Sequence, residues 1–320
     1  MKKVALVSLD GEINGPLAVS LDAMHIAQRL AGQPLFDITT YAPQPKPGER
    51  PTLRADRGLV RLADGRFDAV VLPGLGVTLS QDPLGACARP DVAQVIVSLP
   101  KLHAAGSLIA ASCAATFVLA ESGLLGAGPA TTSWWLAALF RARFPLVDLR
   151  DGELVTQRGQ VFCAGGSLAH VEMMLALLAR LTDKRLASMT ARYLVSPRRA
   201  QQSIHANVME MQIEDPLVAR MVRFVGNHLA EELTMTRCAD AVHTSVRTLE
   251  RRVRAALGLT PQGLVQRMRA EKAIRLLVET RQPLEQITEK VGYEDTTTLR
   301  QLIVRTTGLT PRALRQMAQG

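Results

Sequence analysis

The sequence predicts an α/β domain followed by an all-α domain, and three observations lead to this fold class. Continuous apolar runs alternate with helical segments over residues 1–195. From residue 215 onward two similar helical segments each end in G-L-T-P, beginning at Gly258 and Gly308. Residues 196–214 are polar and lack clear hydrophobic periodicity. We therefore expect domains at 1–195 and 215–320, joined by a linker at 196–214.

The N-terminal domain is predicted to be built from repeated strand–helix units. Buried parallel strands are expected at 3–9, 36–41, 67–76 and 107–111, with further strands around Val147, Val155 and Val161. Helices are expected at 17–30, 91–104, 115–122 and 168–181. Such units imply a mostly parallel sheet with helices on both faces, and ligands of these folds bind at the carboxyl ends of the strands.

The C-terminal domain is predicted to contain two helix-turn-helix motifs, at 233–261 and 283–311. Asp215-Pro216 resembles an N-cap followed by proline and would start the domain's first helix. A long amphipathic helix from Pro261 would hold the two motifs rigidly apart. The apolar residues that recur at helical spacing are Ala239, Val242, Leu249 and Val253 in the first motif, and Ile287, Val291, Leu299 and Ile303 in the second. The alternative is a bundle of ordinary amphipathic helices with solvated arginines.

A helix-turn-helix motif places its second helix in the major groove of DNA, so the outward residues of that helix are the candidate contacts. Arginine suits this role because its guanidinium can bond to guanine edges or to phosphate. In the first motif the candidates are Ser245, which could also cap the helix, Arg247, Glu250, Arg251 and Arg254. In the second motif they are Thr296, Thr297, Arg300, Gln301 and Arg305.

The charge distribution supports a polyanionic partner for the C-terminal domain. The formal net charge is +9, and residues 216–320 hold 17 Lys and Arg against 10 Asp and Glu. The other 215 residues hold 21 against 19, so the basic excess lies where a phosphate-binding surface is needed. Aromatic residues make up only 4% of the chain, which argues against binding single strands by base stacking.

At these residues the chain resembles the AraC/XylS family of bacterial transcription regulators. S-V-R-T-L-E-R-R-V-R resembles that family's first recognition helix, and V-G-Y-E-D with T-T-T-L-R-Q-L-I-V-R-T-T-G-L-T-P resembles its C-terminal signature. The resemblance covers about a third of the chain. The family usually has Phe where Val253 and Ile303 stand, and an aromatic residue at Leu314. These are core positions, so the departures concern packing and not DNA binding.

Cys113 is the most informative residue of the first domain. It lies between an apolar strand and a helix, on a turn that would expose it at the top of the sheet beside a helix N-terminus. Such a position can serve a nucleophile, a pocket residue, or simply a small side chain in a tight turn. The residues predicted to line a ligand pocket with it are Glu12, Asn14, Gly74, Gly76, Ser133 and Trp134.

The surroundings of Cys113 resemble the PfpI-like branch of the class I glutamine-amidotransferase superfamily, and more closely the version found in GlxA-type regulators. A-A-S-C-A-A-T, V-L-P-G-L-G and E-S-G-L-L carry this likeness, which covers residues 1–195 and implies a flavodoxin-like α/β fold. The family's histidine falls at Ser133, and serine cannot accept a proton near neutral pH. Ala114-Ala115 also departs from the family, which often has glycine after the nucleophile. We therefore expect no catalytic residues.

Together the two resemblances imply a regulator of a metabolic operon, commonly an activator working with RNA polymerase and often a homodimer. They imply operator DNA and a small effector as partners, possible effectors being amino-acid-derived compounds or quaternary amines. No cofactor or membrane association is expected. The cysteines lack paired spacing, so no disulfide framework or metal site is expected, and the apolar run at the N-terminus stops at Asp10, too early for a targeting segment. We expect a cytoplasmic protein. The alternatives are a cysteine hydrolase or amidotransferase with a DNA-tethering tail, and a constitutive DNA-binding protein whose first domain only dimerises.

Overall fold

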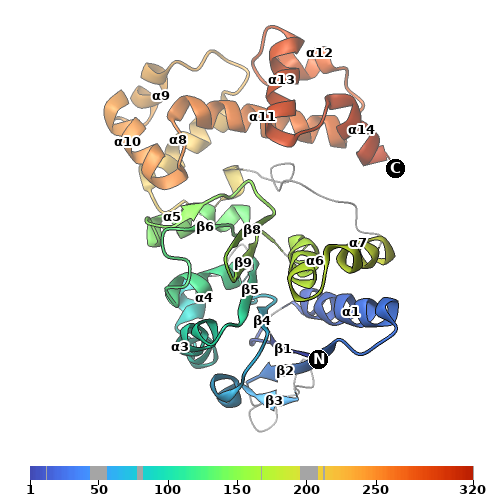
Figure 1. Ribbon diagram of the computed structural model, residues 1–320. Coiled ribbons are helices and arrows are strands. Elements are labelled where there is room, and N and C mark those ends of the chain that lie inside the picture. The colour runs from blue at the N-terminus through green and yellow to red at the C-terminus, as the bar shows by residue number, and fades with distance from the viewer. Residues whose placement is uncertain are drawn as a thin grey trace. The chain divides into compact units, whose positions relative to one another are not determined.

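The computed structural model describes residues 1–11, 13–43, 56–77, 82–166, 168–194, 208–211 and 213–319. These residues form two compact units (Figure 1). The first unit comprises residues 1–133 and 146–199, and the second comprises 134–145 and 200–320.

The first unit is built on a seven-stranded sheet with the strand order β3-β2-β1-β4-β5-β9-β8. Its strands are β1 (Lys2–Val7), β2 (Phe36–Ala42), β3 (Arg57–Gly58), β4 (Ala69–Leu72), β5 (Leu108–Ser112), β8 (Val155–Arg158) and β9 (Val161–Ala164). All neighbours are parallel except β8 and β9, which pair antiparallel. The chain reverses its direction of progress across the sheet between β1 and β4, and this is where α/β folds bind ligands.

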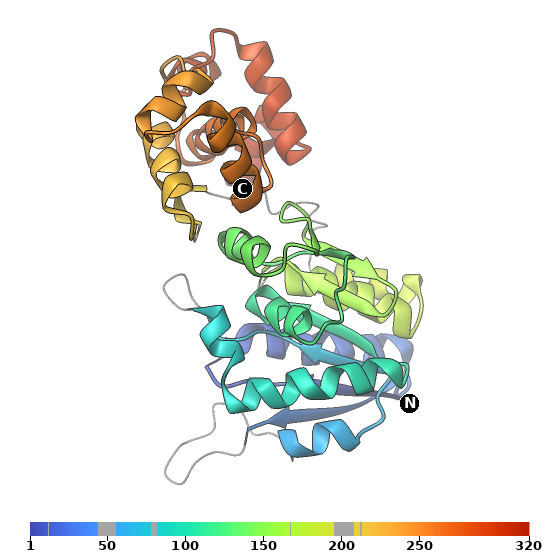
Figure 2. The ribbon, with the colours of Figure 1, turned by 90° about the vertical axis from the view of Figure 1, so that its left-hand side faces the viewer.

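Helices cover both faces of this sheet, as the alternating pattern predicts (Figures 1 and 2). One face is covered by α1 (Asn14–Ala31), α6 (Ala169–Leu181) and α7 (Lys184–Tyr193), which pack on one another. The other face is covered by α2 (Pro83–Cys87), α3 (Pro90–Ala104) and α4 (Thr116–Glu121), with the short helix η1 (Leu59–Asp64) against α3. The central strands are wholly buried because both faces are covered, which explains why they are continuous apolar runs.

The structure differs from the expected N-terminal elements in several places, and it also contains α2 and α5 (Ala137–Arg143), where no helix was expected. The third strand is shorter than 67–76, because the chain after Leu72 turns through Pro73 and two glycines. The residues around Val147 form β7 (Asp148–Leu149), which pairs with β6 (Pro129–Ala130) in a separate two-stranded sheet. Helix α7 is additional: its Asp183 side chain caps the N-terminus by accepting from the Leu186 amide at 2.8 Å.

The second unit is helical. Its elements are α5 (Ala137–Arg143), which follows the turn η3 (Trp134–Leu136), then η4 (Val208–Glu210), α8 (Pro216–Asn227), α9 (Met235–Ala241), α10 (Val246–Leu257), α11 (Pro261–Glu279), α12 (Leu284–Lys290), α13 (Thr296–Thr307) and α14 (Pro311–Gln319). Helix α8 begins as predicted, with the Asp215 carboxylate accepting from the Leu217 and Val218 amides and with proline in its first turn. The helices α9–α10 and α12–α13 are the two expected motifs, and α11 joins them (Figure 1).

The repeated G-L-T-P sequence ends one helix and starts the next. Gly258 and Gly308 adopt left-handed conformations, with φ of 69° and 71°, that close the C-termini of α10 and α13. Two residues later a threonine hydroxyl accepts from the following helix, Thr260 from the Gly263 amide and Thr310 from the Ala313 amide. The proline then occupies a first-turn position, where no hydrogen-bond donor is needed. One four-residue pattern therefore encodes both helix boundaries.

The cores of both motifs use the apolar residues that the periodicity singled out. Leu249 and Val253 in α10, and Leu299 and Ile303 in α13, are fully buried. In the second motif these residues join α11 and Leu314 of α14 in one cluster. Val253, Ile303 and Leu314 thus occupy core positions, and the structure accommodates aliphatic side chains there.

Part of the segment predicted as a linker is packed against the helices that follow it. Residues 196–207 and 212 lie outside the described residues, but 208–211 are described. Val208 is 1% exposed and its backbone N–H donates to the Glu271 carboxylate of α11 at 2.8 Å. Glu271 also accepts from Arg267. The chain is therefore anchored before α8 begins.

Candidate nucleic-acid interface and the Cys113 site

The two helix-turn-helix motifs have the same backbone frame. In the first turn the Thr244 amide donates to the Ala239 carbonyl at 3.0 Å, and in the second the Tyr293 amide donates to the Thr288 carbonyl at 3.0 Å. These equivalent residues are 49 positions apart, whereas Gly258 and Gly308 are 50 apart, so the second turn is one residue longer before its recognition helix. Both α10 and α13 start with a side-chain cap.

The outward face of α10 is basic and largely uncommitted. Arg247, Glu250, Arg251 and Arg254 are all exposed. Within the described part of the chain, none of these four side chains forms a hydrogen bond or an ion pair. Ser245 is the N-cap residue, and its hydroxyl accepts from the Thr248 amide at 3.2 Å. The Ser245 hydroxyl also donates to the Thr248 hydroxyl, with 3.0 Å between the two oxygens. Ser245 therefore caps the helix and lies at its exposed end.

The outward face of α13 is less charged. Thr297, Arg300 and Gln301 are exposed and Thr296 is half-buried. Asp295 caps this helix by accepting from the amides of Thr297 and Thr298. These hydrogen bonds, together with one from the Thr298 hydroxyl, hold the pKa of Asp295 below its usual value. The remaining candidate contact, Arg305, donates to the Gln266 side chain of α11 at 3.3 Å.

Other arginines of this unit are structural, and the sequence pattern did not separate them from the candidate contacts. Arg252 is adjacent to Arg251 but forms an ion pair with the Asp215 cap of α8, with Nε 2.6 Å from Oδ2. Arg269 of α11 donates to the carbonyls of Leu229 and Glu231 and lies 5.2 Å from the centre of the Tyr293 ring. The exposed arginines of α10, by contrast, have no such partner among the described residues, which is what a DNA-binding surface requires.

Cys113 lies on a strained turn between β5 and α4, as the pattern predicts. Its φ is 59°, a left-handed conformation that costs a non-glycine residue of order 1–3 kcal/mol. The Cys113 carbonyl accepts from the Thr116 hydroxyl at 2.8 Å and from the Thr132 hydroxyl at 3.0 Å, and these bonds hold the turn. The thiol is only partly exposed. Strain of this kind persists where the surrounding structure fixes it, commonly at functional sites.

Ser133 contacts Cys113 as the resemblance implies. Its hydroxyl donates to the sulfur at 2.9 Å. The sequence did not single out the buried network beneath them, in which His170 bonds Ser112 through Nδ1 at 2.6 Å and Ser20 through Nε2 at 2.7 Å. Burial lowers the pKa of His170 to about 3, so the ring stays neutral. With both nitrogens engaged, His170 supports the strand end and is not placed to take a proton from the thiol.

The other predicted pocket residues follow the strand ends around the reversal point of the sheet. Gly76, with φ of 69°, follows β4, and its carbonyl lies 4.0 Å from a Cβ placed on Gly11 after β1, so these two loops meet. Gly74 is half-buried in the same loop, and Asn14 is exposed at the start of α1. Glu12 lies outside the described residues. Trp134 belongs to the second unit. Its ring packs edge to face against that of Trp135, with the ring centroids 5.5 Å apart.

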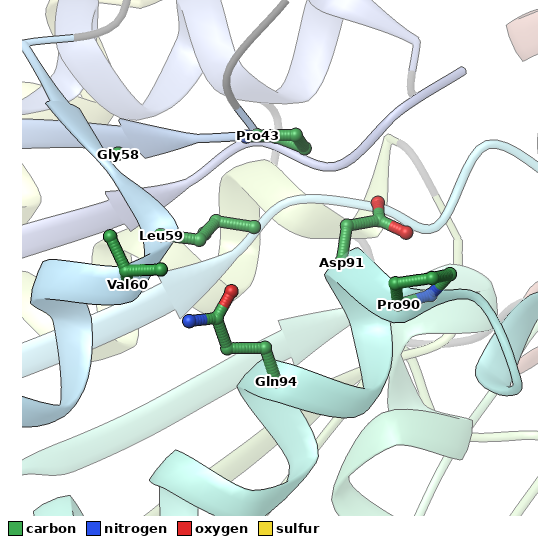
Figure 3. Close-up of a pocket in the computed structure, with 7 residues that line it drawn as sticks. All are labelled: Pro43, Gly58, Leu59, Val60, Pro90, Asp91 and Gln94. Carbon is green, nitrogen blue, oxygen red and sulfur yellow. The ribbon is translucent and has the colours of Figure 1, made fainter.

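A cavity of about 270 Å³ lies elsewhere in the first unit, beside the carboxyl end of β2 (Figure 3). It is lined by Pro43, Gly58, Leu59, Val60, Pro90, Asp91 and Gln94. None of the six predicted ligand-binding residues that the structure describes is among them. The Asp91 carboxylate is engaged by Arg89 at 2.9 Å and by the Asp10 amide at 3.2 Å, so its charge is already compensated. The cavity is small and mainly apolar.

Two features are absent from the residues that the structure describes. No group of three or more His, Cys, Asp or Glu side chains there is arranged to hold a metal ion. No helix in those ranges is both long and apolar enough to cross a membrane. Burial raises the pKa of the Cys163 thiol to about 12 and also raises that of Cys238, which keeps these two cysteines protonated inside the cores.

Comparison with known proteins agrees with this geometry. Residues 238–317, which include α10 to α13, match the family model described as "Helix-turn-helix domain". The chain is 25% identical over 316 residues to the HTH-type transcriptional regulator ArgR of Pseudomonas aeruginosa, covering 95% of this chain and 90% of the relative. The chain carries a helix-turn-helix domain of the AraC type in its C-terminal part. It is therefore a DNA-binding regulator.

The solved structures that resemble the regulator show the fold of its first unit. Drosophila melanogaster DJ-1beta matches with a TM-score of 0.50 and 21% identity, over 62% of this chain and 99% of that one. A protein of Vibrio parahaemolyticus assigned as a transcriptional regulator matches with a TM-score of 0.51 and 21% identity, over 60% of this chain and 98% of that one. The N-terminal domain has the DJ-1/PfpI flavodoxin-like α/β fold, with a mixed sheet.

Proposed function

We propose that the regulator senses a small metabolite with its N-terminal domain, at 1–195, and reads an operator with its C-terminal domain, at 215–320. The observation that supports operator reading is the pair of equivalent recognition helices, on which four exposed arginines have no partner among the described residues: Arg247, Arg251, Arg254 and Arg300. The rigid helix α11 between them would hold the two recognition helices in successive major-groove segments on one side of the DNA. The effector must bind one state of the protein better than another, because equal affinity shifts nothing.

In this proposal the base contacts of α10 come from Arg247, Glu250 and Arg251. Those of α13 come from Thr296, Thr297, Arg300 and Gln301. Ser245, Arg254 and Arg305 contact the phosphates that flank them, which positions the helices without reading sequence. Arg305 would release Gln266 to do so, since its guanidinium bonds that side chain in the structure.

The effector site is proposed around Cys113, with Glu12, Asn14, Gly74, Gly76, Ser133 and Trp134. The strained turn at Cys113 and the meeting of the Gly11 and Gly76 loops support this choice. We propose binding without catalysis, because serine replaces the base and both nitrogens of His170 are engaged. By the same resemblance the effector is an amino-acid-derived compound or a quaternary amine. Activation through RNA polymerase, a homodimer and a cytoplasmic location complete the proposal.

The first test is to map the operators of the full-length protein by binding-site sequencing and to repeat the binding with metabolites of the neighbouring operons. A reproducible duplex sequence, bound more tightly than bulk DNA at moderate salt, is expected. The absence of any sequence preference, with candidate effectors present, would contradict the proposal. Thermal-shift screening of the same metabolites identifies the effector, and a regulator that no metabolite shifts would be a constitutive DNA-binding protein.

The second test separates sensing from catalysis. Cys113→Ser should leave operator affinity within about twofold and change the effector dose–response. Cys87→Ser, which changes a buried thiol of α2, is the matched control and should respond as the wild type does. Hydrolysis of the effector by the wild type that disappears in Cys113→Ala would instead favour a cysteine hydrolase, for which the retained turn geometry is the supporting observation.

A further inference from the structure

The recognition helix of the second motif carries an apolar side chain in the middle of its outward face. Val304 is 42% exposed. Helical spacing places it on the same face as Gln301, Arg300 and Thr297, which stand three, four and seven residues before it and are all exposed. The opposite face of α13 is the buried one, so Val304 takes no part in the core of the motif.

The equivalent position in the first motif is occupied by Arg254, because the two recognition helices are related by 50 residues. Arginine there suits any DNA sequence, since it can bond to phosphate. Valine at an exposed helical position forms helix less well than arginine and leaves apolar surface in water. An exposed valine flanked by polar base-reading candidates is accounted for if an apolar group covers it in the complex.

The major groove offers one such group, the C5-methyl of thymine. The neighbours of Val304 suit the same kind of base pair: the Gln301 amide can pair with the N6 and N7 edge of adenine, and Thr297 adds a methyl of its own. The hydroxyl of Thr298 is already used, since it donates to the Asp295 cap at 2.5 Å.

We propose that Val304 is a specificity-determining residue that packs on a thymine methyl in the half of the operator read by α13. This rests on the proposed function, because it assumes that α13 enters the groove. It makes the two motifs chemically distinct readers: α10 selects with arginines, which prefer guanine, and α13 selects an A·T-rich segment with Gln301 and Val304.

The experiment replaces each thymine of the mapped operator, one at a time, with deoxyuridine, which removes only the methyl group. For the full-length wild type, one position in the α13 half should weaken binding about fourfold, as expected for uncovering one methyl group. Val304→Ala should bind the intact operator about fourfold more weakly and should no longer respond to deoxyuridine at that position. Val278→Ala is the matched control: Val278 is 41% exposed on α11, outside the recognition helices, and this variant should behave as the wild type.

Two results would overturn the inference. One is that deoxyuridine weakens binding of Val304→Ala as much as it weakens binding of the wild type. The other is that no thymine methyl in the α13 half of the operator affects the affinity of the wild type. Val304→Ala should fold as the wild type does, because Val304 is exposed and alanine is the better helix former, so neither result can be attributed to misfolding. Failure here is distinguishable from failure of the proposed function. A wild type with no sequence preference removes the proposed function, whereas operator binding that Arg251→Ala weakens and Val304→Ala does not removes only this inference.

Discussion

The two helix-turn-helix motifs share one backbone frame and differ in the side chains that their recognition helices expose. Both close their recognition helices with a left-handed glycine and lead into the next helix through Thr-Pro. The equivalent residues differ at the five positions that are exposed in both recognition helices: Arg247 against Thr297, Glu250 against Arg300, Arg251 against Gln301, Arg254 against Val304 and Ala255 against Arg305. Burial and capping constrain the frame, and the exposed positions are free to specialise.

The turns show how tightly the frame is constrained. His243 takes the left-handed conformation in the first turn, with φ of 56°, and is exposed. Its equivalent is Gly292, with φ of 79°, where an added Cβ would lie 2.3 Å from the Leu229 carbonyl and 2.7 Å from the Arg269 guanidinium. The first turn thus tolerates a side chain, whereas the second requires glycine, because the chain before α9 passes close to it.

The largest expected effect therefore separates the turns. Gly292→Ala should lower the free energy of unfolding by about 3 kcal/mol, since strain adds to a backbone clash. His243→Ala keeps the existing backbone strain and should change the free energy of unfolding by less than about 1 kcal/mol. Denaturant titration of the full-length variants measures both. Equal effects at the two turns would contradict the difference in packing.

The recognition helices are compared by truncating equivalent side chains. Arg251→Ala should weaken operator binding by about 1–3 kcal/mol and relax selection at one base pair of the α10 half. Gln301→Ala should do the same at one base pair of the α13 half. Both variants should unfold as the wild type does, because neither side chain has a partner among the described residues. Unchanged footprints for either variant would remove that residue from the interface.

A third comparison sets Arg251 against its neighbour Arg252. Burial raises the pKa of Asp215, but hydrogen bonds from Arg252 and from two backbone amides outweigh it, so the pKa lies below its usual value of 3.8. Stability from this group is therefore complete above about pH 4 and is lost as pH falls through the folded pKa. Arg252→Ala should cost about 1 kcal/mol at pH 7 and flatten the acid limb of stability against pH. An acid limb as steep as that of the wild type would contradict this role.

The smallest expected effect concerns salt. Arg254→Ala should reduce the slope of log affinity against log salt concentration by about 1, because one phosphate contact is lost. Val304→Ala, at the equivalent position of α13, should leave the slope unchanged while lowering affinity. Binding titrations at several salt concentrations distinguish the two. Equal slopes for both variants would mean that the equivalent positions do not differ in their partners.

Much of the molecule could be predicted because its signals are local. The G-L-T-P repeat fixes helix ends within a few residues, the apolar spacing marks the buried faces of α10 and α13, and the sharp turn at Cys113 follows from a strand running directly into a helix. Such patterns depend on neighbours along the chain. They sufficed for the main strands and helices and for the outward faces of both recognition helices.

Only the tertiary structure decided which residues far apart in the chain form hydrogen bonds or ion pairs with one another. Arg252 bonds a carboxylate 37 residues away while Arg251 stays exposed, although the two are adjacent in sequence. His170 bonds Ser112 and Ser20, which are 58 and 150 residues away, and so supports Cys113 from beneath. The sequence determined which residues could be charged, capping or buried. Folding determined which of them meet, because a hydrogen bond or an ion pair forms only where packing brings two groups within about 3 Å.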